Sequence, residues 1–353
     1  MRSDGSVGVG LLGAGGISRG ALAPATHAAT GAHLQAVAAR DEARAAALGP
    51  TGRAYGSGSH DGAVAYRALL EDPEVDVVYV GLNNDAHLPW TLAALEAGKH
   101  VLCEKPLGLD EHEAARMHTA AAAAERLLVE AWWYRWHPRT QRAVELVRSG
   151  ALGRVGRVEA EFSFDGDVTG AMAGNYRLDP ARGGGALLDV GCYAVDACRW
   201  ALGAGALEVV DAGGDVVGGV DVRAHGTLRP AGSPEPVAGQ ERTASVRCGI
   251  AGRDEQLVAV YGDEAALVLG SPSFTAKDAP CELHVRPLDD EGHLSAERTT
   301  ETFDAVDPYR LMVEGVARAV RGERTWLPSA QDSIDIATAV STLRARVVGS
   351  PTT

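Results

Sequence analysis

The amino-acid sequence predicts an α/β protein with two domains: an N-terminal Rossmann-type domain, and a C-terminal α/β domain with a large, mostly antiparallel open sheet. Short apolar runs alternate with helical patterns from residue 7 to about residue 130, which is typical of βαβ units and a parallel sheet. From residue 154 polar and apolar residues alternate, as in an antiparallel sheet with one covered face. A chain of 353 residues accommodates both domains, which we place at residues 1–130 and 131–353.

Five short apolar runs are the predicted strands of the first domain. They are residues 7–12, 34–39, 75–80, 100–103 and 127–130. Helical patterns lie between them, at residues 89–97 and 111–125. The second of these helices is so rich in alanine that intrinsic propensity alone favours it.

The second domain is predicted to contain alternating strands and a few helices. The strands are expected at residues 158–164, 220–228, 243–248, 256–261 and 266–269. The helices are expected at residues 141–149, 186–202, 309–320 and 333–347. Three consecutive glycines, residues 183–185, introduce the helix at 186–202.

Composition and charge exclude several classes of partner. The net charge of −14 disfavours nucleic acid and anionic membranes. No apolar run approaches the roughly 20 residues of a membrane span, and the first residues lack the apolar segment of a signal peptide. Five scattered cysteines match neither a zinc site nor a disulfide framework, so we expect no metal and a cytoplasmic location.

A glycine-rich loop follows the first predicted strand and opens a helix. Gly13 permits a tight turn, and Gly15 lets the backbone approach a pyrophosphate at the helix N-terminus. Ser18 takes the place of the third glycine and is small enough for close helix–strand packing. Because such loops also occur without a nucleotide, the βαβ context supports the prediction. The predicted cofactor-binding residues of this loop are Gly13, Ala14, Gly15, Gly16, Ile17 and Ser18.

The end of the second strand indicates which cofactor the loop would hold. An acidic residue there would bind the ribose 2′-hydroxyl of NAD, whereas an arginine accommodates the 2′-phosphate of NADP. Ala39 occupies the expected acidic position and Arg40 follows it, which favours NADP over NAD. In the alternative, Arg40 is only a solvated residue and Asp41 caps the next helix.

Lys105 follows the predicted strand at residues 100–103 and is the candidate proton donor. A side chain at the carboxyl end of a parallel strand points into the crevice where open α/β sheets bind ligands. Burial beside a cationic cofactor ring would lower the pKa of this lysine towards neutrality. Pro106 fixes the backbone beside it.

A second group of polar side chains is predicted on the helix at residues 186–202. Asp189 and Tyr193 are four residues apart, so they share one helix face. Together they can bind a polyol and relay a proton; in the alternative, they are a surface Asp and a half-buried Tyr. Arg177 could bring a cation to them. Trp133 and Arg135 could reach a nicotinamide, or the tryptophans of this segment could only seal a domain interface.

These motifs together resemble the Gfo/Idh/MocA family, named after glucose–fructose oxidoreductase, inositol dehydrogenase and a rhizopine-catabolism protein. They occur in the family's order: Gly13-x-Gly15, Asn83 to His87, Glu104-Lys105-Pro106, Glu130 to Arg135, and Gly183 to Gly191. The resemblance implies that Lys105 is the general acid/base. Tyr193 stands where much of the family has histidine, as in the branch of glucose–fructose oxidoreductase, dihydrodiol and xylose dehydrogenases and 3-ketosugar reductases.

The resemblance further implies contacts with the cofactor or its nicotinamide end. The residues are Tyr66, Leu82, Asn84, His87, Glu104, Arg177 and Asp189. It also implies that residues 131–353 bind the substrate and assemble the chain into a homodimer or homotetramer through the open sheet.

The expected function is an NADP(H)-dependent oxidoreductase acting on CH–OH groups of a small sugar-like substrate. Arg40 suggests NADPH and therefore reduction of a keto sugar. The alternatives are oxidation of an aldose such as xylose or glucose, or of a trans-dihydrodiol. An alternative from another class is a non-catalytic NADP-binding sensor, against which the presence of Lys105, Asp189 and Tyr193 counts.

Overall fold

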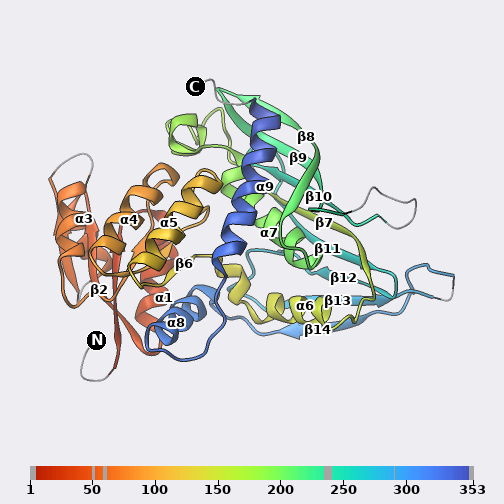
Figure 1. Ribbon diagram of the computed structural model, residues 1–353, viewed down its shortest axis with the longest axis horizontal. Coiled ribbons are helices and arrows are strands. Elements are labelled where there is room, and N and C mark those ends of the chain that lie inside the picture. Colours follow the sequence, from red (N-terminus) through yellow and green to blue (C-terminus); the bar gives the residue numbers. More distant parts are fainter. Residues whose placement is uncertain (1–4, 50–51, 59–61, 234–240, 290, 350–353) are drawn as a thin grey trace. The chain divides into compact units, whose positions relative to one another are not determined.

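The computed structural model describes residues 5–49, 52–58, 62–233, 241–289 and 291–349 (Figure 1). The chain forms two compact units that interleave along the sequence. The first contains Met1–Gly108, His112–Trp136 and Asp307–Ser333; the second contains Leu109–Glu111, His137–Val306 and Ile334–Thr353. A single boundary at residue 130 was expected from the sequence. The difference arises because α8 (Pro308–Val320) returns to the first unit and packs on α1 (Ala23–Ala28).

The first unit contains a six-stranded parallel sheet in the order β3-β2-β1-β4-β5-β6. Its strands are β1 (Val7–Leu12), β2 (Ala32–Ala39), β3 (Arg53–Gly56), β4 (Val77–Val80), β5 (His100–Cys103) and β6 (Leu128–Glu130). All five predicted strands are present, whereas β3 was not predicted. The order of the strands reverses between β1 and β4, and ligands of such sheets bind outside the carboxyl ends of the strands at this point.

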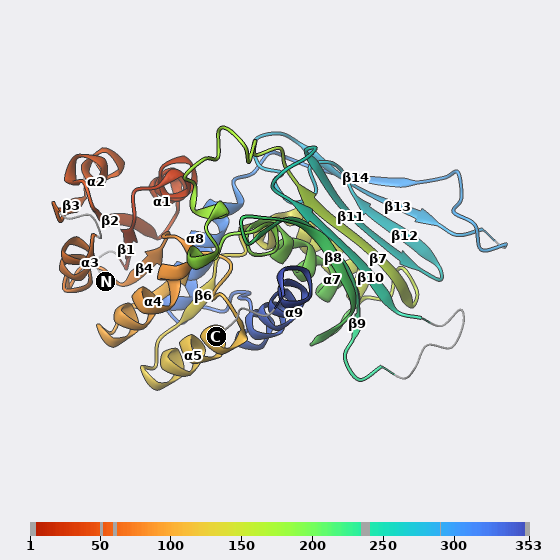
Figure 2. The same cartoon turned by 90° about the horizontal axis from the view of Figure 1, so that it is seen from above.

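Helices cover both faces of this sheet (Figure 2). One face carries α1, α2 (Glu42–Leu48) and α8; the other carries α3 (Ala63–Leu70), α4 (His87–Glu96) and α5 (Glu111–Ala123). Every residue of β1 is buried, as expected of a strand covered on both sides. The Rossmann-type architecture predicted from the sequence is therefore confirmed.

The second unit contains an eight-stranded sheet in the order β14-β13-β12-β11-β7-β10-β9-β8. Its strands are β7 (Val155–Ser163), β8 (Leu207–Val217), β9 (Val220–Pro230), β10 (Thr243–Gly249), β11 (Glu255–Gly262), β12 (Ala265–Leu269), β13 (Cys281–Pro287) and β14 (Thr299–Phe303). Neighbouring strands are antiparallel except β7 and β10. The predicted mostly antiparallel sheet is confirmed.

Three helices of the second unit lie on the same face of its sheet: α6 (Pro138–Arg148), α7 (Cys192–Ala201) and α9 (Ala330–Val348) (Figures 1 and 2). The helix predicted at residues 186–202 begins with a π-helical segment, η6 (Leu187–Gly191), and continues as α7. Among the described helices, none covers the opposite face. In the same described part of the chain, no helix is both long and apolar enough to cross a membrane.

Candidate active site

The glycine loop after β1 depends on the absence of a side chain at Gly13. This residue has a φ of 97°, a conformation that L side chains rarely adopt. A Cβ atom at position 13 would lie 2.8 Å from the carbonyl oxygen of Gly81 and 2.9 Å from Leu82. The Gly13 N–H donates to the carbonyl of Ala38 at 2.9 Å. The tight turn therefore requires glycine at this position.

The next two glycines leave open space beside the loop. A Cβ atom at Gly15 or at Gly16 would have no protein atom within 4 Å. Ser18, at the start of the helical segment η1 (Ser18–Leu22), is buried, and its hydroxyl has no hydrogen-bond partner among the described residues. Open backbone, a helix start and an unsatisfied hydroxyl fit the pyrophosphate of a dinucleotide.

The segment after β2 combines the two roles considered for it. Asp41 caps α2, because its carboxylate accepts the N–H groups of Ala43 and Arg44 at 2.8 and 3.3 Å. Arg40 is exposed at the carboxyl end of β2. The guanidinium of Arg44 donates to the carbonyl of Ala14 at 3.0 Å and so joins α2 to the glycine loop. No sequence pattern indicates this last contact, because Arg44 and Ala14 lie far apart along the chain.

The segment that carries Lys105 is held at each neighbouring residue. The carboxylate of Glu104 accepts from the hydroxyl of Tyr79 at 2.8 Å and from the Lys105 N–H at 3.2 Å. The Leu107 N–H donates to the buried carboxylate of Glu130 on β6 at 2.8 Å. Burial and the charge of Glu104 raise the pKa of Tyr79 well above its ordinary value, so this phenol stays a donor. The backbone at Lys105 is therefore fixed from both sides.

His87 connects this segment to the end of β4. Its side chain is fully buried, with Nδ1 at 2.8 Å from the carbonyl oxygen of Pro106 and Nε2 at 3.1 Å from that of Leu82. Burial lowers the pKa of His87, which disfavours the imidazolium. Because both ring nitrogens face backbone carbonyls, we expect His87 to shape the site by positioning Leu82 and Pro106. The neighbouring Asn84, on the same turn, is also buried.

The aromatic residues of the first unit form packed pairs. Trp133 stacks on Tyr309 of α8, with ring centroids 4.6 Å apart and 14° between the planes. Arg135 is buried, and its guanidinium lies 5.3 Å from the ring centroid of Trp326. Tyr66 meets Trp90 edge to face at 4.9 Å. Tyr309 was not singled out from the sequence, because its contact with Trp133 joins segments far apart in the chain.

Several of the predicted residues of the first unit thus lie at one edge of its sheet. The glycine loop follows β1, Arg40 follows β2, Leu82 follows β4, and Lys105 follows β5. Since all of these strands are parallel, their carboxyl ends meet at that edge. The arrangement suits a dinucleotide bound across the sheet with Lys105 towards one end.

Among the predicted residues of the second unit, Asp189 and Tyr193 are buried and Arg177 is partly exposed. The guanidinium of Arg177 forms two contacts with the carboxylate of Asp189, Nε–Oδ2 at 2.6 Å and Nη2–Oδ1 at 3.1 Å. Burial opposes the charge of Arg177, but Asp189 raises the pKa of this guanidinium above its ordinary value. Tyr193, one helical turn later, packs on Phe162 and Phe274. The alternative of a surface Asp with a half-buried Tyr is therefore wrong.

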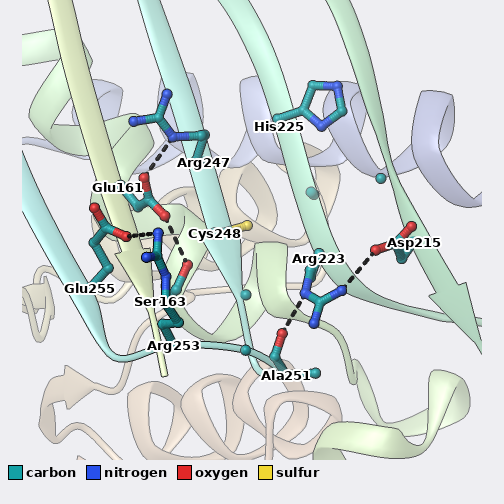
Figure 3. A pocket seen from close by; sticks show the side chains of 14 residues that line it. Glu161, Ser163, Asp215, Arg223, His225, Arg247, Cys248, Ala251, Arg253 and Glu255 are labelled. Carbon is teal, nitrogen blue, oxygen red and sulfur yellow. Dashed lines mark hydrogen bonds and ion pairs between the residues drawn. The ribbon is translucent and has the colours of Figure 1, made fainter. Parts of the chain in front are cut away.

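A cavity of about 500 Å³ lies elsewhere in the second unit, on the strands β7 to β11 (Figure 3). Its arginines are already paired with carboxylates: Arg223 with Asp215, Arg247 with Glu161, and Arg253 with Glu255. Figure 3 also shows Arg223 donating to the carbonyl of Ala251. None of the predicted catalytic or cofactor-binding residues lines this cavity.

Comparison with protein families defines the class. A profile described as "Oxidoreductase family, NAD-binding Rossmann fold" matches residues 7–131, so the protein is an oxidoreductase built on this fold. A second profile, the GFO/IDH/MocA C-terminal domain, matches residues 140–268. The chain belongs to the Gfo/Idh/MocA family, as its motifs predicted.

Several relatives act on sugars. The D-xylose 1-dehydrogenase (NADP(+)) 2 of Haloferax volcanii is 37% identical over 336 residues, which are 93% of each chain. A dTDP-3,4-didehydro-2,6-dideoxy-α-D-glucose 3-reductase of Actinomadura kijaniata is 36% identical over 204 residues, 58% of each chain. The structure of KijD10, a 3-ketoreductase from the same organism solved with NADP and TDP-benzene, superposes with a TM-score of 0.81. It is 26% identical and covers 97% of this chain and 98% of that chain.

Proposed function

We propose that this protein is an NADP(H)-dependent sugar oxidoreductase in which Lys105 is the general acid/base. The observation that carries the proposal is the fixed segment at the end of β5: Glu104 and Glu130 hold the backbone on both sides of Lys105. A proton donor works only from a defined position within hydrogen-bond reach of the reacting oxygen. The clamped backbone supports such a position for the lysine.

The choice of NADP rests on Arg40 and on the relatives. Arg40 is exposed at the carboxyl end of β2, and the residue before it is alanine where an NAD site would carry an acid. The Haloferax volcanii relative, which matches nearly the whole chain, is named as an NADP(+) enzyme. Gly13, Gly15 and Ser18 would hold the pyrophosphate, and Arg40 the 2′-phosphate.

When bound, NADP(H) would supply hydride transfer to or from a sugar carbon. Lys105 gives the proton to the carbonyl oxygen in reduction, or takes it from the hydroxyl in oxidation. We expect Tyr193 and Asp189 of the second unit to bind hydroxyl groups of the sugar. Arg177 pairs with Asp189 at 2.6 Å and orients this carboxylate, which could accept hydrogen bonds from sugar hydroxyls.

Two directions are open for the sugar substrate. Reduction of a keto sugar follows from the expectation of NADPH, and the 3-ketoreductase KijD10 shares the fold over nearly the whole chain. Oxidation of an aldose is the second candidate, because the relative that matches 93% of this chain is a xylose dehydrogenase.

We also propose that the open face of the second sheet forms a subunit contact of a homodimer or homotetramer. Its cross-strand ion pairs, such as Glu208–Arg229, could be covered without leaving an unpaired charge.

The test is a cofactor-coupled screen with purified protein. Keto sugars would be offered with NADPH and with NADH, and aldoses and trans-dihydrodiols with NADP⁺ and with NAD⁺. We expect turnover with at least one sugar and a preference for the phosphorylated cofactor. NADPH binding without any turnover would support the sensor alternative, and a preference for NADH would refute the role of Arg40. Analytical ultracentrifugation at micromolar protein concentration tests the proposed homodimer or homotetramer. A monomer in this experiment would contradict the proposed subunit contact.

A further inference from the structure

Asp221 is a buried carboxylate that the proposed chemistry does not use. It lies near the start of β9, and its side chain is inaccessible to solvent. Its Oδ2 accepts the N–H of Leu187 at 2.6 Å, where the helical segment η6 begins. Burial raises the pKa of Asp221 to about 6, while Arg344 on α9 opposes the shift and Cys248 on β10 faces the same carboxylate. The Asp221 carboxylate, whose burial is unfavourable, thus lies at the start of the helical segment that carries Asp189.

Asp221 also lies close to Gly185. The backbone of Gly185 connects Arg177 and Asp189, which form the ion pair described above. A Cβ atom at Gly185 would lie only 2.1 Å from Oδ1 of Asp221, and the φ of this glycine is 118°. The Gly185 N–H donates to the carbonyl of Arg177 at 2.9 Å, and its own carbonyl accepts the Asp189 N–H at 3.1 Å. Oδ1 of Asp221 therefore lies close to Gly185, whose backbone is hydrogen-bonded to both Arg177 and Asp189.

We propose that Asp221 is a positioning residue for the Arg177–Asp189 ion pair and for the Tyr193 side chain one turn later. Its carboxylate fixes the backbone from Gly185 to Leu187, and this backbone sets the separation of Arg177 and Asp189. The catalytic meaning of this role rests on the proposed function, whereas the positioning itself can be tested without turnover.

The same residues argue against a role in general stability alone. Beside Asp221, the carbonyl of Val222 accepts the N–H of Ile250 at 2.9 Å, a backbone hydrogen bond that does not involve the Asp221 side chain. The segment that Asp221 contacts comes before α7, and α7 packs on the sheet through its own buried residues. Loss of Asp221 should therefore act first on residues 185–189.

The experiment compares Asp221→Ala and Asp221→Asn with Val222→Ala, a control that removes buried atoms from the adjacent position. The first readout is amide hydrogen exchange in the whole protein. We expect Asp221→Ala to speed exchange of the Leu187 and Asp189 amides at least tenfold and to leave amides in the middle of α7 within twofold. Asp221→Asn should restore protection, because its carboxamide oxygen can still accept from Leu187. Val222→Ala should change neither amide selectively.

The second readout is turnover with a substrate found in the screen. Asp221→Ala should lower kcat/KM about 10- to 100-fold, Asp221→Asn should recover to within about fivefold of the wild type, and cofactor affinity should not change. Unchanged exchange at Leu187 and Asp189 in Asp221→Ala would overturn the proposal. The proposal would also be overturned if Val222→Ala increased the exchange rates of the same two amides by as much as Asp221→Ala does. Because exchange needs no substrate, failure of the proposed function alone would leave this result standing.

Discussion

Arg177 and Asp189 form a bidentate ion pair within the second unit, at 2.6 and 3.1 Å. The carboxylate of Asp189 is almost fully buried, whereas about a third of the Arg177 side chain is exposed. A buried carboxylate needs a cation or hydrogen-bond donors to offset its burial, and Arg177 supplies both to Asp189.

Replacing Arg177 should therefore impair substrate binding and catalysis together. In Arg177→Ala, Asp189 loses its compensating charge, and we expect kcat/KM to fall about 100-fold. Arg177→Lys should recover only part of this loss, because an ammonium cannot make the bidentate contact. Steady-state kinetics measure the effect, with Arg253→Ala as the control because Arg253 pairs with Glu255 at the surface. Full activity in Arg177→Ala would contradict the role.

Lys105→Ala should abolish turnover and leave cofactor binding largely intact. A general acid/base contributes about 10²- to 10⁴-fold, so we expect a loss of at least that size in kcat. Fluorescence titration with NADPH should give a Kd within about threefold of the wild type. Lys277→Ala provides the matched control in the second unit. Robust activity of the Lys105 variant would refute the proposed mechanism.

Arg40→Ala should weaken NADPH much more than NADH. A charge-assisted hydrogen bond to phosphate is worth about 1.5–3 kcal/mol, which corresponds to roughly a 10- to 100-fold change in Kd. The affinity for NADH, which lacks the 2′-phosphate, should change less than about twofold. Arg116→Ala on the exposed side of α5 serves as the control. Equal losses for both cofactors would show that Arg40 does not recognise the phosphate.

Two alanine substitutions in the glycine loop should separate folding from binding. Gly13→Ala places a methyl group against Gly81 and Leu82 in a left-handed conformation, so we expect a lower Tm. Gly15→Ala meets no protein atom, so its Tm should match the wild type while the affinity for NADPH falls at least tenfold. Thermal melts and titrations report the two properties. A Gly15→Ala protein that binds NADPH normally would exclude the pyrophosphate from this position.

The burial of Asp221 should appear in the pH dependence of stability. Its pKa is raised from 3.8 to about 6 in the folded protein, so the folded state holds this proton more tightly than the unfolded state. The stability linked to that proton is present below about pH 4 and is lost as the pH rises through 6. The shift corresponds to ~3 kcal/mol, which Asp221→Asn should remove. Urea unfolding between pH 4 and 7.5 measures it; a constant difference between the two proteins would contradict the expectation.

Local sequence patterns were enough to predict the fold class. The strands β1 and β5 were predicted at their observed bounds, because each is a short apolar run between turn residues. Among the missed strands, β3 and β14 are short and contain no buried residue, so they carry no periodic signal. β8 was missed for a similar reason, because it contains two glycines and most of its residues are exposed.

The residues missed at the site depend on tertiary contacts. Arg44 contacts Ala14, Tyr309 stacks on Trp133, and Asp221 contacts Leu187, and each pair is distant in sequence. A motif reports residues whose spacing is fixed along the chain, such as Asp189 and Tyr193. It contains no information about a partner that only folding brings near.

The interleaved order of the two units makes the second sheet an insertion in the first unit. The chain leaves the first unit after Trp136 and returns at Asp307, so the first unit is built from segments on both sides of the inserted sheet. A fragment ending at residue 130 would lack α8 and thus the helix that packs on α1. Because the first unit needs segments on both sides of the inserted sheet, a single cut in the chain cannot separate the two units.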